Sequence, residues 1–495
     1  MKIEETRTQI QLSRYSVKRA VIAVSLANLC FISAWQRCIY GQPFYSPLWS
    51  QSFLFALVLN ITALAAVFYL LLTLSARINV RGYYFDGLVY AIPLFSVSNE
   101  IRRAGVLSGH GHLAAISLIA VPSIFGITLF WYQRKLLAVA EFVTIGLVVL
   151  FPFNLIRSVL IANRAGTAPS LAVRISVPDR SRPRVIWLIF DEMDFTLSFN
   201  RRPANVRIPA FDRLRSEAFF ATAAEQPGVA TLISMPTLIS GRPVFGKPEA
   251  QGTRTLLVRF SAQASPADWG AVPSVFSDAR AANLNVGIVG WYFPYCRIFS
   301  TVASECYSEP MYSGLSDRAS FRTIVIDQLD SLTPLESRVR LVQRVHRMIT
   351  AAESMASDPE LGLVLIHLPV PHGPPIFDRD SGKITLFNSR EDWFFDNLVL
   401  ADRVMSEIRE GMERSGQWDS SVVIVSSDHS LREEMMPHPD PTPLVPFIIK
   451  MPGQTQGRDF NSPFNAEITR ELIGRIISGE ITAANLPTWI EQHAH

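Results

Sequence analysis

Apolar residues form long runs in the first third of the chain and short runs after it. The long runs occupy residues 20–35, 53–74, 83–97, 113–132 and 136–156. A helical membrane span needs about twenty apolar residues, a length that three of the five runs reach. Residues 83–97 are short and contain Asp86, which makes this run the weakest candidate. The pattern predicts four or five membrane helices within residues 1–164.

The pattern changes at residues 165–183, a polar stretch rich in proline that is typical of a linker. After it, short runs rich in Val and Ile alternate with helical spacing of apolar residues. Strands are predicted at 185–190, 286–291, 361–366, 422–426 and 445–449, and helices at 338–352 and 392–414. Alternating strands and helices predict an α/β domain over residues 184–495, built on a central, mostly parallel sheet.

The distribution of positive charge barely distinguishes the two possible orientations of such a membrane protein. If all five runs span, the basic residues near 14–19, 77–81 and 134–135 lie inside and the α/β domain faces outside. Arg102 and Arg103 contradict that orientation, because they then lie outside as well. If residues 83–97 do not span, the α/β domain is cytoplasmic.

The cysteines bear on the orientation, and the net charge bears on the kind of partner. Cys296 and Cys306 lie ten positions apart in a polar stretch, where they can close a disulfide if the domain sits in an oxidising compartment. That pair favours the outward-facing domain. The net charge is only +3, and basic runs with interleaved aromatic residues are absent, so a nucleic-acid partner is not expected.

Ionisable residues directly follow three of the predicted strands. Asp191 and Glu192 end the first strand, His367 ends the third, and Asp428 and His429 end the fourth. The carboxyl ends of parallel strands meet at one edge of a sheet, so these side chains are expected to lie close together. Carboxylate and imidazole ligands suit a divalent ion such as zinc or manganese, with a position left open for substrate.

A candidate nucleophile lies in residues 230–241, an apolar segment in which small polar residues recur. Proline is tolerated in the first turn of a helix, so Pro236 predicts a helix that begins near Ser234, just after Thr231. A kinked helix that begins at Thr231 is the alternative. In both cases the helix N-terminus favours an anionic group, and a metal would activate the Thr231 hydroxyl as a nucleophile.

These motifs resemble the alkaline-phosphatase/sulfatase superfamily, most closely its membrane-bound phosphoethanolamine and phosphoglycerol transferases. The transferase nucleophile segment, Thr-x-x-Ser-x-Pro, is matched by Thr231, Ser234 and Pro236. The acidic ligand that follows the family's first core strand is matched by Glu192, and Asp191 occupies a neighbouring position that sulfatases use.

Three histidine segments extend the resemblance to roughly residues 183–455. The family's His-x-x-x-x-His-Gly-Pro segment is matched from His367 to Pro374 and includes His372. Its Ser-Asp-His-Gly segment is matched by residues 427–430, except that Ser430 replaces the glycine. A family histidine that precedes a Val-Pro strand is matched by His438.

Carried over by position, the resemblance implies a main metal centre and two histidines that contact the phosphate or a second ion. The implied metal ligands are Asp191, Glu192, Thr231, Asp428 and His429, with Asp191 the least certain. His372 and His438 would orient the phosphoryl group or protonate the leaving group. For His367, a supporting role and simple packing at a strand end remain equally open.

The resemblance implies a zinc enzyme of the bacterial inner membrane, with manganese as the alternative metal and with the catalytic domain in the periplasm. It would move phosphoethanolamine or phosphoglycerol from a phospholipid donor, through a phospho-Thr231 ester, to an envelope glycan or lipid such as lipopolysaccharide. Sulfate-ester hydrolysis is disfavoured, because a threonine cannot be converted to formylglycine. A phosphodiester hydrolase with the same residues and a catalytically silent membrane protein that regulates envelope assembly remain alternatives. Ser430, in place of the family glycine, could crowd the backbone near the metal.

Overall fold

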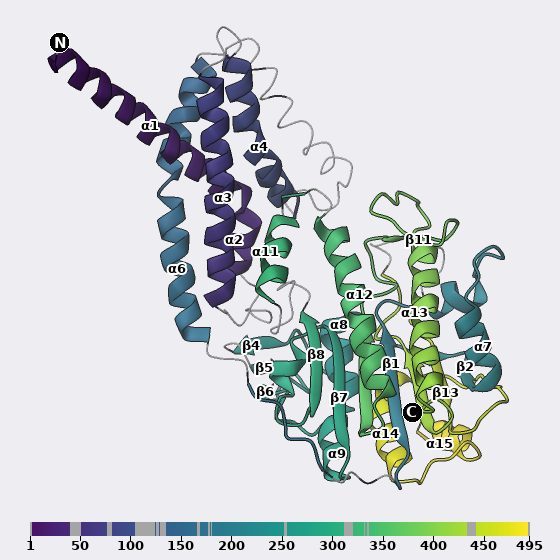
Figure 1. Ribbon diagram of the computed structural model, residues 1–495. Helices are drawn as coiled ribbons and strands as arrows, with labels where there is room; N and C mark the ends of the chain where they lie inside the picture. The colour runs from purple at the N-terminus through teal and green to yellow at the C-terminus, as the bar shows by residue number, and fades with distance from the viewer. Residues whose placement is uncertain are drawn as a thin grey trace. The chain divides into compact units, whose positions relative to one another are not determined.

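The chain divides into two compact units (Figure 1). The helical unit comprises residues 1–42, 46–167 and 318–336, and the sheet unit comprises residues 43–45, 168–317 and 337–495. Within them, the computed structural model describes residues 2–39, 51–76, 82–103, 124, 128, 135–165, 169–176, 179, 181–251, 255–310, 320–330, 332–333, 336–432 and 442–493.

The helical unit contains the segments that the sequence predicts to span a membrane. Its helices are α1 (Lys2–Cys30), α2 (Ile32–Ile39), α3 (Gln51–Ser75), α4 (Gly82–Arg103), α6 (Leu150–Ala165) and α11 (Phe321–Asp330). In the described part of the chain, two stretches are long and apolar enough to cross a bilayer by length and composition, Gln51–Ser75 and Lys135–Ile161. The predicted span at 113–132 lies outside the described residues, apart from two isolated positions.

Helix α11 belongs to the helical unit, although the sequence assigns residues 184–495 to a single domain. Asn60 on α3 donates a hydrogen bond from Nδ2 to Oε1 of Gln328, at 3.0 Å. Gln328 in turn donates from Nε2 to the carbonyl oxygen of Phe53, at 3.0 Å. The buried amide of Gln328 thus accepts from one residue of α3 and donates to another, which explains why α11 packs on α3.

A sheet of eight strands forms the centre of the sheet unit, in the order β14-β2-β13-β12-β1-β9-β7-β8. Strands β12, β1, β9, β7 and β8 are mutually parallel. Strand β13 runs antiparallel to both of its neighbours, β12 and β2. The five predicted strands are all present, so the α/β fold with a mostly parallel central sheet is confirmed. The strands are β1 (Arg184–Phe190), β2 (Phe219–Ala221), β7 (Asn285–Tyr292), β8 (Glu305–Pro310), β9 (Leu361–Leu368), β12 (Ser421–Ser426), β13 (Phe447–Lys450) and β14 (Arg458–Phe460).

Helices cover both faces of this sheet. Alternate residues of β1 pack into opposite cores, Trp187 into one and Leu188 into the other, as the two-residue period of a strand requires. The helices of the sheet unit are α7 (Pro209–Glu217), α8 (Thr231–Ser240), α9 (Val275–Ala281), α10 (Tyr295–Ile298), α12 (Glu336–Ser357), α13 (Phe394–Arg414), α14 (Thr469–Ile477) and α15 (Leu486–Gln492). Its short strands are β3 (Ala224–Glu225), β4 (Glu249–Gln251), β5 (Thr255–Val258), β6 (Ala267–Asp268), β10 (Phe377–Asp378), β11 (Lys383–Ile384) and β15 (Phe464–Asn465).

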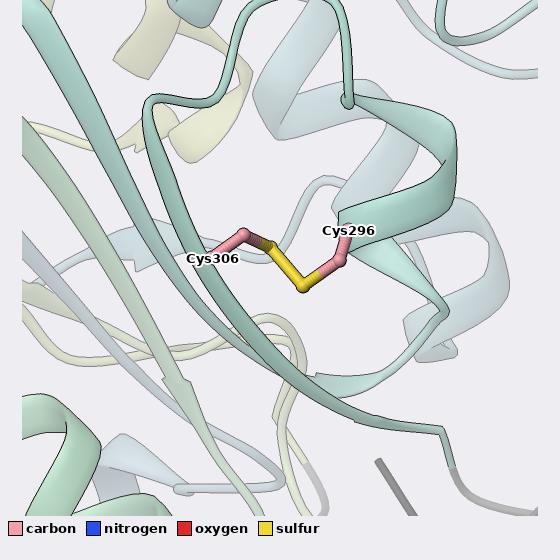
Figure 2. Close-up of a disulfide and its surroundings, with 2 residues drawn as sticks. All are labelled: Cys296 and Cys306. Atoms are coloured by element: carbon pink, nitrogen blue, oxygen red, sulfur yellow. A yellow bond between two sulfur atoms is a disulfide. The ribbon is translucent and has the colours of Figure 1, made fainter. Parts of the chain in front are cut away.

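The connection from β7 to β8 is fixed by a disulfide. Cys296 in α10 and Cys306 in β8 are bonded to each other (Figure 2). Next to this bond, the buried ring of Tyr295 packs against Gly290 of β7, where an added Cβ would lie 2.1 Å from the ring. A side chain at position 290 would therefore displace Tyr295, whose hydroxyl lies 3.0 Å from Nδ1 of His367 at the end of β9.

Candidate active site

The candidate site lies at the carboxyl ends of β1 and β12, which are adjacent and parallel. Asp191 and Glu192 follow β1, whereas Asp428 and His429 follow β12 after one further serine, Ser427. Thr231 is the first residue of α8. All five side chains are buried. The fold thus brings together side chains from three segments that are far apart in the sequence.

Three of these side chains can hold one metal ion. A ligand atom from each of Asp191, Asp428 and His429 lies within 4.8 Å of the other two. The Thr231 hydroxyl oxygen lies 3.4 Å from Oδ1 of Asp191 and 3.3 Å from Nε2 of His429. Nδ1 of His429 donates to the carbonyl oxygen of Ser430, at 2.8 Å, which leaves Nε2 as the acceptor that faces the cluster.

The charges at this point favour a cation. Burial, together with the carboxylates of Asp428 and Glu192, raises the pKa of Asp191 well above its ordinary value. Burial also acts to raise the pKa of Asp428, but His429 and His367 hold it below its ordinary value. Oδ2 of Asp428 is buried and has no hydrogen-bond partner among the described residues. A divalent ion would satisfy this oxygen and stabilise both carboxylates, so the side chains present fit a metal.

Helix α8 begins at Thr231, so the predicted start near Ser234 is wrong and the alternative start is the one observed. The N–H groups of Ile233 and Ser234 both bond to the carbonyl oxygen of Ala230, which starts the helix. The Ser234 hydroxyl bonds to the carbonyl oxygens of Gly228, at 2.9 Å, and Ala230. Thr231 therefore lies in the first turn, where backbone N–H groups lack partners within the helix.

Glu192 lies beside the cluster in a different group, with Arg432 and His372. Nε of Arg432 donates to Oε1 of Glu192, at 2.5 Å, and Nη2 of Arg432 lies 3.3 Å from Nε2 of His372. Nε2 of His372 lies 3.7 Å from Oε2 of Glu192. Burial lowers the pKa of His372, which favours its neutral form. Glu192 is thus the counterion of Arg432, a pairing that the motif resemblance does not indicate.

Ser430, which replaces the family glycine, is accommodated without strain. Among the described residues that are not glycine, positive φ angles occur only at Glu192, Asn283 and Tyr292, so position 430 needs no glycine. Gln226 accepts hydrogen bonds at Oε1 from the Ser430 N–H, at 2.8 Å, and from its hydroxyl, at 3.1 Å. The serine side chain is therefore bound by Gln226.

The remaining histidines have different positions. His367 is buried next to Tyr295, and burial lowers its pKa to about 4. It is not part of the three-residue metal cluster. His372 pairs with Arg432, as described above. His438 lies outside the described residues.

Trp291, at the end of β7, is a site residue that the sequence analysis missed. Its indole N–H donates to Oδ2 of Asp191, while Thr231 and His429 approach Oδ1 of the same carboxylate. The guanidinium of Arg344 stacks on the indole, 4.4 Å from the ring centroid. The only signal in the sequence was the position of Trp291 at the end of a predicted strand.

We expect Trp291→Phe to weaken metal binding, because phenylalanine keeps most of the packing but removes the donor that orients Asp191. Outer hydrogen-bond partners of metal ligands contribute about ten- to hundredfold to metal affinity. Zinc titration of the purified full-length protein measures this. The matched control is Trp269→Phe, since Trp269 is equally buried but its indole N–H has no partner among the described residues. Equal zinc affinities in the two variants would contradict the role of Trp291.

Comparisons with known proteins give only distant likenesses. No family model and no curated protein matches the chain. Among solved structures, it is similar to Ps i-CgsB in complex with k-i-k-neocarrahexaose, at 13% identity, with 63% of this chain and 77% of that chain covered and a TM-score of 0.45. It is also similar to a protein of the alkaline phosphatase superfamily from Vibrio parahaemolyticus (13% identity, 64% and 74% covered, TM-score 0.39) and to the phosphonate monoester hydrolase of Agrobacterium radiobacter (12% identity, 61% and 78% covered, TM-score 0.38). The chemistry of this chain is accordingly inferred from its own site.

Proposed function

We propose that this chain is a metal-dependent phosphotransferase that uses Thr231 as its nucleophile. One observation carries the proposal: a buried threonine hydroxyl at a helix N-terminus lies against a cluster of two carboxylates and an imidazole. Asp191, Asp428 and His429 would hold the ion, with the Thr231 oxygen as a further ligand. When bound, a divalent metal, zinc foremost and manganese as the alternative, would act as a Lewis acid and favour the ionised hydroxyl.

The side chains of the site would have separate roles in such a transfer. Oδ1 of Asp191 faces the Thr231 hydroxyl and can accept its proton, while Nε2 of His429 would bind the ion. The Thr231 oxygen then forms a bond to phosphorus while the bond from phosphorus to the leaving oxygen breaks, and the proton taken up by Asp191 passes to that oxygen to give the free alcohol. The first-turn N–H groups of α8 stabilise charge on the phosphoryl oxygens. An acceptor hydroxyl reverses these steps and takes the group from Thr231.

For the substrate, we propose the head group of a phospholipid, phosphoethanolamine or phosphoglycerol, and an envelope glycan or lipid as acceptor. Two helical stretches long enough to span a bilayer support a lipid donor, and they expose large apolar side chains such as Phe55, Leu70 and Phe142. The disulfide between Cys296 and Cys306 supports a sheet unit that faces the periplasm across a bacterial inner membrane.

Mass spectrometry of the Thr231 peptide, after incubation of the full-length protein with membrane lipids, tests this function. We expect an adduct on Thr231 whose mass identifies the transferred group, and its loss when an acceptor is added. Release of the free head group in water would instead indicate hydrolysis by the same residues. A protein that binds zinc but forms neither adduct nor product would be the catalytically silent alternative.

A further inference from the structure

Arg432 is a cation beside the candidate metal cluster that neither the proposed function nor the motifs explain. It follows His429 by three residues, and its side chain is 39% exposed although its partner Glu192 is fully buried. The guanidinium therefore extends from the buried carboxylate towards solvent. Arg432 is thus the partly exposed member of a group of charged side chains whose carboxylates are buried.

The buried Glu192 and the partly buried His372 fix the orientation of this guanidinium. Glu192 binds Nε, and the neutral His372 accepts from Nη2. His372 is itself oriented, because its Nδ1 donates to the carbonyl oxygen of Gly373, at 2.6 Å. Glu192 has a left-handed backbone, with φ of 60°, which an ordinary residue adopts only when its surroundings impose it. Within the described residues, these contacts leave Nη1 of Arg432 without a protein partner.

The charge balance of the site explains why a cation is needed beside the metal cluster. Asp191, Glu192 and Asp428 are three buried carboxylates, and a single divalent ion offsets two of their charges. Burial alone would lower the pKa of Arg432, but Glu192 raises it above its ordinary value, so the guanidinium is always charged. It offsets the third carboxylate, and without it an incoming phosphate would meet net negative charge.

We propose that Arg432 is a substrate-binding residue whose guanidinium, positioned by Glu192 and His372, binds the non-bridging oxygens of the transferred phosphoryl group. This inference rests on the proposed function. The planar fork of arginine matches phosphate oxygens, and Nη1 of Arg432 is used by neither Glu192 nor His372. Glu192 then acts through Arg432 rather than as a ligand of the metal.

Inhibition by inorganic phosphate tests this role in the full-length, zinc-loaded protein, with release of diacylglycerol as the activity. We expect Arg432→Ala to weaken phosphate inhibition and to raise KM, each roughly ten- to hundredfold, because one charge-assisted contact is lost. Arg432→Lys should recover part of the loss, since it restores the charge without the fork. Zinc content should not change. Arg475→Ala is the control, because Arg475 also forms ion pairs, with Glu471 and Glu480, but lies outside the site.

The outcomes separate this inference from the function on which it rests. Unchanged phosphate inhibition in Arg432→Ala would overturn the inference and leave the proposed function intact. Loss of zinc from Arg432→Ala would also overturn it, since Arg432 would then support the metal. We expect Glu192→Gln to keep its zinc while phosphate inhibition weakens; loss of zinc there would make Glu192 a metal ligand. If the wild-type protein neither binds phosphate nor releases diacylglycerol, the proposed function fails and the inference fails with it.

Discussion

Thr231→Ala is expected to abolish the release of diacylglycerol from a phospholipid, whereas Thr231→Ser should retain a measurable part of it. Alanine removes the only atom that can form the bond to phosphorus, and loss of a nucleophile typically costs about 10⁴-fold or more in kcat. Serine keeps the hydroxyl but lacks the methyl group that restricts its rotation, so we expect a smaller loss. Steady-state kinetics of the detergent-solubilised full-length variants measure both effects.

The same helix provides a matched control for this substitution. Thr237 is also buried on α8, but its hydroxyl bonds to the carbonyl oxygen of Ile233, at 2.8 Å, and is not part of the candidate site. Thr237→Ala should therefore keep the turnover of each folded molecule. Zinc content should also be retained in Thr231→Ala, because Asp191, Asp428 and His429 are still present. Turnover by Thr231→Ala within tenfold of the wild-type value would exclude Thr231 as the nucleophile.

The strands and the position of the site were predictable because both depend on local patterns. Short runs of Val and Ile indicate strands that are buried on both faces, and β1, β9 and β12 were found where these runs occur. Ionisable residues at the ends of such runs must lie at one edge of a parallel sheet. Asp191, Asp428 and His429 meet there for this reason.

The partners of these residues were not predictable, because they come from distant segments with no pattern of their own. Arg432 is separated from Glu192 by 240 positions, and nothing in its local sequence indicates an ion pair. Trp291 reaches Asp191 across a hundred positions. A motif identifies a chemical type at a position, but the direction of a side chain depends on which tertiary contacts satisfy it.

The unit to which helix α11 belongs was likewise not predictable from the sequence. Its sequence, with apolar residues between charges, resembles that of the helices in the sheet unit, and the chain order assigns it to that unit. Its assignment to the helical unit depends on the two amides of Asn60 and Gln328, which lie 268 positions apart. Pairing between single polar residues cannot be inferred from hydrophobic periodicity.

Removal of the metal is expected to abolish turnover and also to lower the melting temperature of the sheet unit. The folded protein binds the ion far more tightly than the unfolded chain, so bound metal stabilises the fold by about 2.7 kcal/mol at a hundred times its dissociation constant. Without the ion, the adjacent carboxylates of Asp191 and Asp428 are left buried together. Dialysis against a chelator, followed by thermal unfolding and activity assays, measures both losses, and added zinc should reverse them.

Substitution within the cluster should reproduce the effect of the chelator, which distinguishes a specific site from general metal binding. Asp428→Asn removes one charged ligand, so we expect low zinc content and a melting temperature that no longer responds to the chelator. Asp402→Asn is the matched control: Asp402 is a buried carboxylate on α13 that accepts from the N–H of Phe211, outside the site. This control should remain sensitive to the chelator. If the wild-type protein keeps both its activity and its melting temperature after chelation, the buried cluster is not a metal site, and Thr231 would have to be activated by Asp191 and His429 alone.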